Sequence, residues 1–505
     1  MEQKEIMTLA AMICYLAMVV VVGIIFSKRN NTSEEFYLGG RGLGPWVTAM
    51  SAEASDMSSW LLMGLPGLAY LTGLADASWT AIGLAVGTYL NWRITAVPLR
   101  NYTQVANNSI TLPDFFSNRF HDEKKILMNV SALFILIFFI AYTASGFVAC
   151  GRLFNTLFGF NYIGSMVLSA VIIVVYTVIG GFLAESAVDF IQGVLMFVAL
   201  FTIVGVGVAA VGGINEVFAN VSVNQGYLSM FTVSNAETGE ASSYGIISML
   251  SGLAWGLGYF GMPHVLLRFM AIRDASELKK SRIIGTTWCV LSLGMAVFIG
   301  VVGRALYPTL LRGSESESIF VVMCKTLLDG GLLPFVGGIM LCGILAAQIS
   351  TADSQLLVAS SAVSQNFYKG LIRPNASEKE VMWISRLTII FIAIAGCFLA
   401  LNPDSSIFQI VSFAWAGFGA TFGPLILFSL YWKRINFYGA AAGMISGGLS
   451  VLIWKMLLNP LGGFFKVYEL LPSFLISCLF IVVVSKMTKE PDESIIKEFE
   501  AYKSM

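Results

Sequence analysis

Long apolar segments, repeated from one end of this 505-residue chain to the other, restrict its possible folds more than any other feature. A helix needs about 20 mostly apolar residues to cross the hydrocarbon core of a bilayer. We therefore predict an all-α membrane protein with thirteen transmembrane helices. Their approximate ranges are 6–27, 45–72, 75–97, 126–149, 160–183, 187–212, 243–269, 283–306, 331–360, 381–401, 406–432, 437–458 and 468–486.

The composition excludes a soluble protein and argues against an enzyme. Hydrophobic residues make up 57% of the chain and charged residues 12%, which is too little charge to cover a soluble surface. The seven cysteines show no paired spacing, and there are two histidines, His121 and His264. This pattern predicts free thiols, with no disulfide framework and no metal centre built from histidine or cysteine. We predict no enzymatic activity, no cofactor and no nucleic-acid partner.

The placement of lysine and arginine predicts the orientation in the membrane. No small-residue cleavage site follows the first apolar segment, so we interpret that segment as a retained helix. With the N-terminus outside, 23 of the 30 basic residues fall on the inner side, among them Lys28 and Arg29. Cytoplasmic loops of membrane proteins carry this excess. We predict a plasma-membrane protein with its N-terminus outside, its C-terminus inside and an odd number of helices.

Polar residues interrupt the second apolar segment between Ser51 and Trp60. Glu53 and Asp56 lie within one turn of each other, and Gly64 follows shortly after them. Polar groups at bilayer depth are costly and usually line a pathway or a site. An interrupted helix frees carbonyl oxygens, which suit a hard cation such as sodium. A polar seam between helices explains the serines alone, but the two carboxyl groups favour a site.

Two further polar groups lie in predicted helices. Ala347 and Ser350, with Thr351 and Ser354, follow the i, i+3, i+4, i+7 spacing and share one helix face. A close-packed seam between helices explains this small, hydroxylated face equally well. The second group consists of Glu185, Asp189 and Gln192, near the inner end of the sixth predicted helix. We interpret these residues as interfacial capping groups.

Three glycines and a proline within residues 255–263 argue against a continuous helix in the seventh apolar segment. This segment lies five helices after the interrupted second one. Broken helices at matching positions of two five-helix halves are typical of an inverted-repeat transporter. We predict one transmembrane transporter domain over 1–505. Its parts are an extra first helix (6–27), a first inverted repeat (45–212), a second inverted repeat (243–432), extra C-terminal helices (437–486) and a cytoplasmic tail (487–505).

Short motifs along nearly the whole chain resemble those of one transporter family. They lie at 37–44, 54–58, 60–67, 111–116, 180–184, 255–261, 263–264, 268–271 and 412–420. Together these motifs resemble the sodium/solute symporter family. The resemblance implies the leucine-transporter-type architecture, a five-plus-five inverted repeat with flanking helices.

The resemblance also implies a sodium site between the unwound part of the second helix and the ninth helix. Carbonyl oxygens would come from Ala54, Met57 and Ala347. Side-chain oxygens would come from Ser350 and Thr351.

Two neighbouring residues, Asp56 and Ser58, match positions of the family that influence sodium coupling and ligand binding. Some family members build a second sodium site, and the matching residues here are Asp189, Asp353 and Ser354. Asp353 stands where a neutral residue is more usual, so the number of sodium ions per cycle is left open.

The implied substrate pocket is that of proline. A pyrrolidine ring packs on aromatic faces, and a carboxylate is stabilised at the positive end of a half-helix. Glu53 departs from the pattern, because a glycine is expected there. The residues that match the pocket are Trp60, Tyr142, Trp255, Tyr259 and Pro263.

The predicted function is sodium-coupled symport of L-proline into the cell by alternating access. A betaine-like osmoprotectant or another small carboxylate is the alternative substrate. A solute-gated channel or a sensor is the alternative of a different class. A channel would have little use for an aromatic pocket, and a sensor would normally carry a signalling domain. The expected partners are a small solute, sodium as the coupling ion and membrane lipid.

Overall fold

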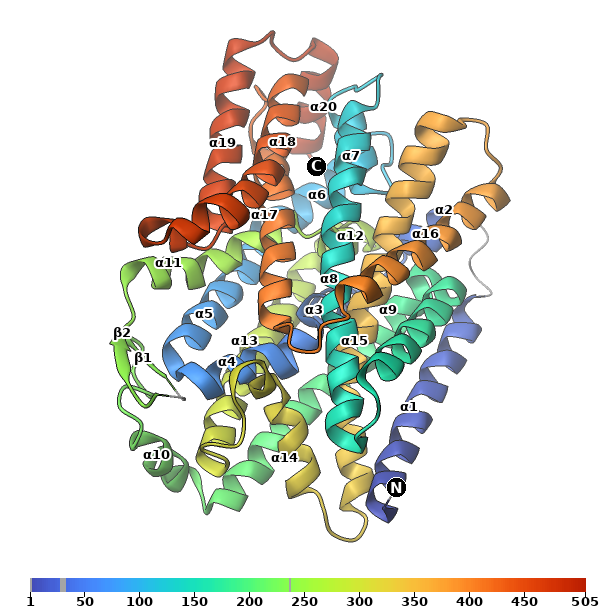
Figure 1. The fold of residues 1–505 in the computed structure, drawn as a ribbon. Coiled ribbons are helices and arrows are strands. Elements are labelled where there is room, and N and C mark those ends of the chain that lie inside the picture. The colour runs from blue at the N-terminus through green and yellow to red at the C-terminus, as the bar shows by residue number, and fades with distance from the viewer. Residues whose placement is uncertain (1, 28–32, 236–237) are drawn as a thin grey trace.

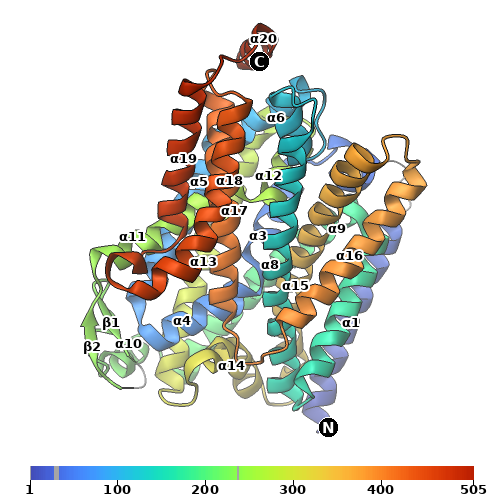
Figure 2. The ribbon, with the colours of Figure 1, turned by 45° about the horizontal axis from the view of Figure 1, so that its top comes forward.

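The computed structural model describes residues 2–27, 33–235 and 238–505. Its long helices run side by side in one bundle, as Figures 1 and 2 show. The two termini lie at opposite ends of this bundle, which fits an odd number of membrane crossings. Lys28 and Arg29, on which the predicted orientation partly depends, lie outside the described residues. The orientation stays a prediction.

The helices of the first half lead into a short antiparallel hairpin of β1 (Thr232–Ser234) and β2 (Ala241–Ser243). These helices are α1 (Gln3–Ser27), α2 (Ser33–Leu38), α3 (Pro45–Ser59), α4 (Leu65–Thr72), α5 (Leu74–Leu90), α6 (Ala96–Val105), α7 (Leu112–Arg119), α8 (Ile126–Phe158), α9 (Tyr162–Val211) and α10 (Ile214–Ser222).

The second half returns to helices after the hairpin. They are α11 (Ile246–Ala254), α12 (Pro263–Ala271), α13 (Leu278–Leu306), α14 (Ile319–Leu327), α15 (Leu333–Ser361), α16 (Glu378–Leu399), α17 (Ile407–Tyr431), α18 (Phe437–Ile453), α19 (Leu470–Met487) and α20 (Glu493–Lys503).

The 50-residue helix α9 turns back on itself at Gly181, where φ is 67° and ψ is 177°. Glycine adopts this backbone conformation without a steric penalty. A straight helix of this length would be about 75 Å long, more than twice the hydrocarbon thickness. Just before α9 begins, the Leu157 carbonyl accepts a hydrogen bond from Lys325 of α14. Near the other end of α9, Gly207 lies so close to Met323 of α14 that an added side chain would clash with it. Both ends of α9 therefore lie beside the same helix.

By length and composition, nine helices of the described residues could cross a membrane, or ten if the bent pair α11 and α12 counts as one span. Two causes separate this number from the predicted thirteen. With 15 and 17 residues, α3 and α5 are shorter than a full span. The helix α9 corresponds to the two predicted helices 160–183 and 187–212 but is counted as one. The fold class is all-α as predicted, and the count of thirteen stays a prediction.

Both predicted interruptions occur in the structure. Ser58, near the end of α3, has a left-handed φ of 49° and a ψ of −174°, and a wider turn over Trp60–Gly64 leads into α4. The second interruption follows a tight helical turn over Trp255–Gly261, where Met262 is extended and the chain bends by 47° before α12. In transporters, breaks of this kind free backbone groups for ion and substrate binding.

Glycines bring the broken seventh segment close to the third predicted helix. A methyl group added at Gly83 of α5 would lie 2.5 Å from the Gly252 carbonyl oxygen. At Gly87, the added methyl group would lie 2.4 Å from the Gly256 backbone. Small residues let helix backbones approach this closely in membranes. As a result, α5 packs directly against the broken seventh segment.

Candidate functional site

Three of the five oxygens of the predicted sodium site meet where the interrupted α3 packs against α15. The Ser350 hydroxyl oxygen lies 2.8 Å from the Ala54 carbonyl oxygen and 3.1 Å from the Ala347 carbonyl oxygen. The Thr351 hydroxyl is buried without a hydrogen-bond partner among the described residues. An unsatisfied buried hydroxyl is costly, and a bound cation would satisfy it. The donor set, all neutral oxygens, suits sodium.

Met57 and Ser58 lie at the break itself, one turn after Ala54. The Trp60 N–H donates to the carbonyl oxygens of both residues and lies 3.1 Å from the Ser58 hydroxyl. A left-handed φ is uncommon for a serine, and such backbone strain gathers at functional sites. The strained turn at Ser58 ends the regular hydrogen bonding of α3 and leaves the Met57 carbonyl at the interruption.

Asp56 connects the predicted sodium residues to the predicted substrate residues. The Tyr142 hydroxyl of α8 donates to the Asp56 carbonyl oxygen at 3.1 Å. The Tyr259 hydroxyl faces the Asp56 carboxyl group. Asp56 is 4% exposed. The second, fourth and seventh predicted helices therefore meet at this one residue.

An aromatic cluster lies next to the breaks. Trp60 and Trp255 stack with ring centroids 5.4 Å apart, and the Tyr259 ring lies edge-on to Trp415 at 5.1 Å. The Trp415 indole N–H donates to the Trp255 carbonyl at 2.8 Å. Aromatic rings in such contacts contribute area and defined geometry. The aromatic cluster consists of Trp60, Trp255, Tyr259, Phe408, Trp415 and Tyr468.

Three members of the aromatic cluster were not among the predicted substrate residues. Trp415 lies in the motif at 412–420, which pointed to this helix without assigning it a role. Phe408 and Tyr468 lie in stretches that carry no such signal. In contrast, Pro263 lies at the start of α12 and lines a narrow gap with residues such as Tyr37 and Thr111. The described contacts do not place Pro263 in the aromatic cluster.

A buried ion pair holds the end of α17 that carries Phe408. Arg152 Nη1 of α8 lies 2.6 Å from Glu317 Oε2. The same carboxylate accepts from the Ser406 hydroxyl at 2.8 Å and from the N–H groups of Ile407 and Phe408 at 2.9 and 3.0 Å. An anion at a helix N-terminus satisfies otherwise free N–H groups. Glu317 therefore fixes the start of α17 beside the aromatic cluster.

The interpretation of Glu185, Asp189 and Gln192 as interfacial capping groups is wrong. All three are buried inside the bundle, and Arg268 of α12 forms an ion pair with Glu185 and lies 3.3 Å from Asp189 Oδ2. Gln192 donates to the Tyr15 hydroxyl at 2.8 Å. Sequence spacing did not show the partner Arg268, because it follows Asp189 by 79 residues.

The same cluster includes the two α15 residues of the predicted second sodium site. Arg268 donates to the Ser354 hydroxyl at 2.6 Å, and Ser354 also contacts Glu185. Asp353 Oδ1 accepts from the Ser354 N–H at 2.7 Å. Its other oxygen, Oδ2, is buried and has no partner in the described part of the chain. Two carboxyl groups, those of Glu185 and Asp189, therefore pair with one guanidinium, and Asp353 adjoins Ser354, which the guanidinium also contacts.

Glu53, the other departure from the family pattern, forms hydrogen bonds on the side of α5. Its Oε1 accepts from the Trp92 indole N–H at 2.9 Å and from the Thr88 hydroxyl at 3.2 Å. An added methyl group at Gly285 of α13 would lie 2.8 Å from the same oxygen. Glu53 thus ties the interrupted helix to α5 and α13, on a different side from the predicted sodium oxygens.

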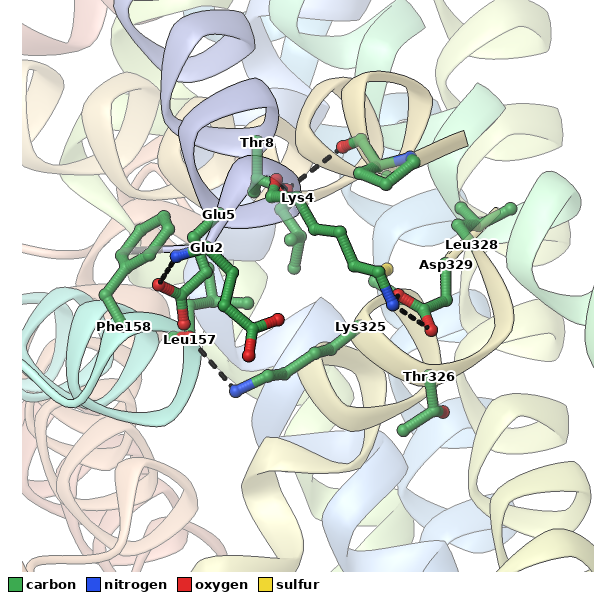
Figure 3. A pocket seen from close by; sticks show the side chains of 14 residues that line it. Glu2, Lys4, Glu5, Thr8, Leu157, Phe158, Lys325, Thr326, Leu328 and Asp329 are labelled. Atoms are coloured by element: carbon green, nitrogen blue, oxygen red, sulfur yellow. Dashed lines mark hydrogen bonds and ion pairs between the residues drawn. The ribbon is translucent and has the colours of Figure 1, made fainter. Parts of the chain in front are cut away.

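An open pocket of about 380 Å³ lies elsewhere, at the end of the bundle that carries the N-terminus (Figure 3). Lys4 Nζ reaches to 2.8 Å from Asp329 across this pocket, and Lys325 donates to the Leu157 carbonyl. The lining residues include neither a predicted sodium ligand nor a predicted substrate residue. The pocket is therefore separate from the candidate site.

A family model described as the sodium:solute symporter family matches residues 36–447, most of the chain. The chain belongs to the sodium:solute symporter family. Members of this family are transporters, and the protein is an integral protein of the plasma membrane that uses sodium as its coupling ion. The resemblance drawn from the sequence motifs is confirmed.

Curated relatives in this family match nearly the whole chain. The osmoregulated proline transporter OpuE of Bacillus subtilis is 43% identical over 96% of both chains. The sodium/proline symporter of Haemophilus influenzae is 42% identical and covers 96% of this chain and 95% of its own. A sodium/proline symporter of Staphylococcus aureus is also 42% identical, over 94% of this chain and 92% of its own.

Solved structures place the fold. A sodium-coupled sialic acid symporter in an outward-open state matches with a TM-score of 0.77, at 19% identity over 96% of this chain and 99% of its own. The nucleobase-cation symporter Mhp1 matches with a TM-score of 0.54, at 13% identity over 92% of this chain and 98% of its own. The leucine-transporter-type architecture is therefore confirmed.

Proposed function

We propose that this sodium:solute symporter carries L-proline into the cell together with sodium by alternating access. The observation that carries the proposal is the contact of Ser350 with the Ala54 carbonyl, two residues before Asp56 and its tyrosine neighbours. It joins a set of neutral oxygens to an aromatic cluster through one interrupted helix. The names of the relatives at 42–43% identity supply proline as the solute.

The proposed sodium ligands are the five oxygens of Ala54, Met57, Ala347, Ser350 and Thr351. A carrier must release its ion, and neutral oxygens bind sodium without the strong attraction of a carboxylate. In the proposed cycle sodium binds first and ties α3 to α15. Asp56 and Ser58 act on coupling, because their backbone shapes the break that the ligands share.

The proposed substrate residues are Trp60, Tyr142, Trp255, Tyr259 and Pro263. The pyrrolidine ring packs on the aromatic faces, while its carboxylate meets N–H groups freed at the break and its ammonium meets freed carbonyls. Phe408, Trp415 and Tyr468 join this set as packing partners of Trp255 and Tyr259.

We further propose the predicted domain layout for this protein. The two inverted repeats comprise 45–212 and 243–432, with 6–27 and 437–486 as flanking helices and 487–505 as a cytoplasmic tail. The breaks at Ser58 and at Met262 support this layout, because each lies in the first membrane segment of its proposed repeat. The N-terminus is outside and the C-terminus inside.

Replacing Tyr259 by alanine should weaken proline binding on the order of 30-fold, because an aromatic anchor in a packed pocket contributes about 2 kcal/mol. Sodium binding should change less than threefold. Both affinities are measured by ligand binding to the purified protein in detergent. The Tyr259→Phe variant keeps the ring and serves as the control. Equal losses of both affinities would indicate a folding defect and contradict the assignment.

We propose a second sodium site at Asp189, Asp353 and Ser354, in which Arg268 occupies the carboxylate cluster when the ion is absent. Two sodium ions and a zwitterionic proline then carry two positive charges per cycle. The charge ratio follows from the membrane potential at which proline flux reverses in proteoliposomes. The Asp353→Asn variant should lower the ratio from two to one. A ratio of one in the unmodified protein would contradict the second site.

Competition tests the choice of solute. Uptake of labelled proline is measured with and without sodium in the presence of unlabelled proline, a betaine or a small carboxylate. We expect sodium-dependent uptake of labelled proline that unlabelled proline inhibits strongly and that betaine and the small carboxylate do not. If betaine or the carboxylate competes better than proline, the solute is that compound. A sodium current without stoichiometric proline flux would show a channel instead.

A further inference from the structure

The C-terminal helix α20 lies at one end of the bundle (Figure 2), where contacts with α6 and α17 dock it. Its buried side chains are Ile495, Phe499 and Tyr502, at the i, i+4, i+7 spacing of one helix face. The opposite face carries exposed residues such as Lys497. An 11-residue helix is marginal in water by itself, so the docked face stabilises it.

One side of the docking surface surrounds a buried arginine. The Tyr502 ring stacks on Tyr102 of α6 at 4.1 Å, and the Arg119 guanidinium lies 5.1 Å from the Tyr102 ring and 5.5 Å from the Phe499 ring. Arg119 is fully buried, and its two terminal nitrogens have no hydrogen-bond partner in the described ranges. Cation–π contacts strengthen when the cation is desolvated in this way. The Phe499 ring of α20 therefore contacts this charge directly, and the Tyr502 ring packs against Tyr102, a second ring that contacts it.

The other side of the docking surface is the end of α17. The Tyr502 hydroxyl donates to the Leu430 carbonyl, and Lys503 Nζ lies 4.4 Å from the Tyr431 ring centroid. A hydrogen bond between His121 Nε2 and Glu498 Oε1, 3.0 Å long, adds a contact with the loop that follows α7. The single helix α20 thus binds α6, the end of α7 and α17 at once.

These three contact points come from different parts of the transporter. By the proposed layout, α6 continues the first repeat and α17 ends the second. Alternating access requires groups of helices to move against each other, and a solute leaves on the C-terminal side only when that end of the bundle opens. Because α20 contacts α6 of the first repeat and α17 of the second, it resists the separation of the two repeats at this end of the bundle.

We propose that α20 is an intramolecular clamp on the cytoplasmic gate. When docked, it holds the ends of α6 and α17 together, and its release allows the exit pathway to open. The proposal rests on the proposed transport function. It gives the tail a regulatory role, because any condition that weakens the docked face increases the exit rate.

The test reads the opening of the gate directly, without proline or transport. Ser361 of α15 lines the narrow gap beside Thr111 and Pro263 and is 4% exposed. A Ser361→Cys variant is labelled by a membrane-impermeant maleimide from the C-terminal side, and mass spectrometry measures the reaction at that position. The comparison is between the full chain, a chain that ends at Lys489 and the exposed-face control Lys497→Ala.

Removal of α20 should speed the labelling roughly 3- to 30-fold, the range expected for the loss of buried cation–π contacts. The Lys497→Ala control should label at the unmodified rate. Unchanged or slower labelling in the shortened chain would overturn the clamp. If the shortened chain does not fold, the Phe499→Ala variant is judged by the same two outcomes. Because proline is not involved, failure here leaves the transport assignment untouched.

Discussion

Replacing Thr351 by alanine should raise the sodium concentration for half-maximal proline uptake roughly 10- to 100-fold. The hydroxyl is buried without a partner in the described residues and is one of five proposed ligands. An oxygen bound to a charged group contributes about 1.5–3 kcal/mol, which gives this range. Proteoliposomes loaded without sodium and diluted into a sodium series provide the measurement.

Two controls separate ion binding from packing. Thr351→Ser keeps the hydroxyl and should retain nearly normal sodium dependence. Thr177→Ala removes a buried threonine hydroxyl that bonds within α9, far from the ion residues in the chain, and should also behave normally.

Asp56→Asn should raise the sodium requirement, because Asp56 lies at the break that joins the ion and substrate residues. A Thr351→Ala variant with unchanged sodium dependence would contradict the proposed ligand set.

Replacing Arg268 by methionine should lower the free energy of unfolding by about 3–5 kcal/mol. The guanidinium is fully buried and pairs with Glu185 and Asp189, and removal of one partner leaves uncompensated charge in the interior. The measurement is thermal or denaturant unfolding in detergent. The matched control is Arg273→Met, because Arg273 pairs with Glu277 at an exposed position and such pairs contribute about 0–1 kcal/mol.

A second substitution tests the cause of this loss. Glu185→Gln removes a negative charge from the same cluster and should restore part of the stability of the Arg268→Met variant. Glu185→Gln in the unmodified chain should destabilise, since it removes a partner of Arg268. Additive effects of the two changes would show that the residues act independently, against the geometry of the ion pair.

Local sequence patterns predicted much of the fold. The apolar segments predicted most of the long helices, and polar or glycine-rich stretches predicted the breaks at Ser58 and Met262. The spacing of Ser350 and Thr351 placed them on one face of α15. In each case the signal is local, because the period of a helix and the loss of its hydrogen bonds depend on neighbouring residues.

What the sequence did not predict depends on contacts between distant residues. Arg268 pairs with Glu185 across 83 positions, so local spacing suggested capping groups instead. Phe408 and Tyr468 enter the aromatic cluster from stretches without a motif. The reversal of α9 at Gly181 was expected as a loop between two helices, whereas a single glycine suffices for the turn.

The most direct test of the central claim is proline uptake by proteoliposomes that contain only the purified protein. An inward sodium gradient with a negative internal potential should accumulate proline above its external concentration. Replacing sodium by potassium, or collapsing the gradient, should abolish the accumulation. Two results would contradict sodium-coupled proline symport. One is proline uptake of equal extent without a sodium gradient, and the other is no accumulation of proline when the gradient is present.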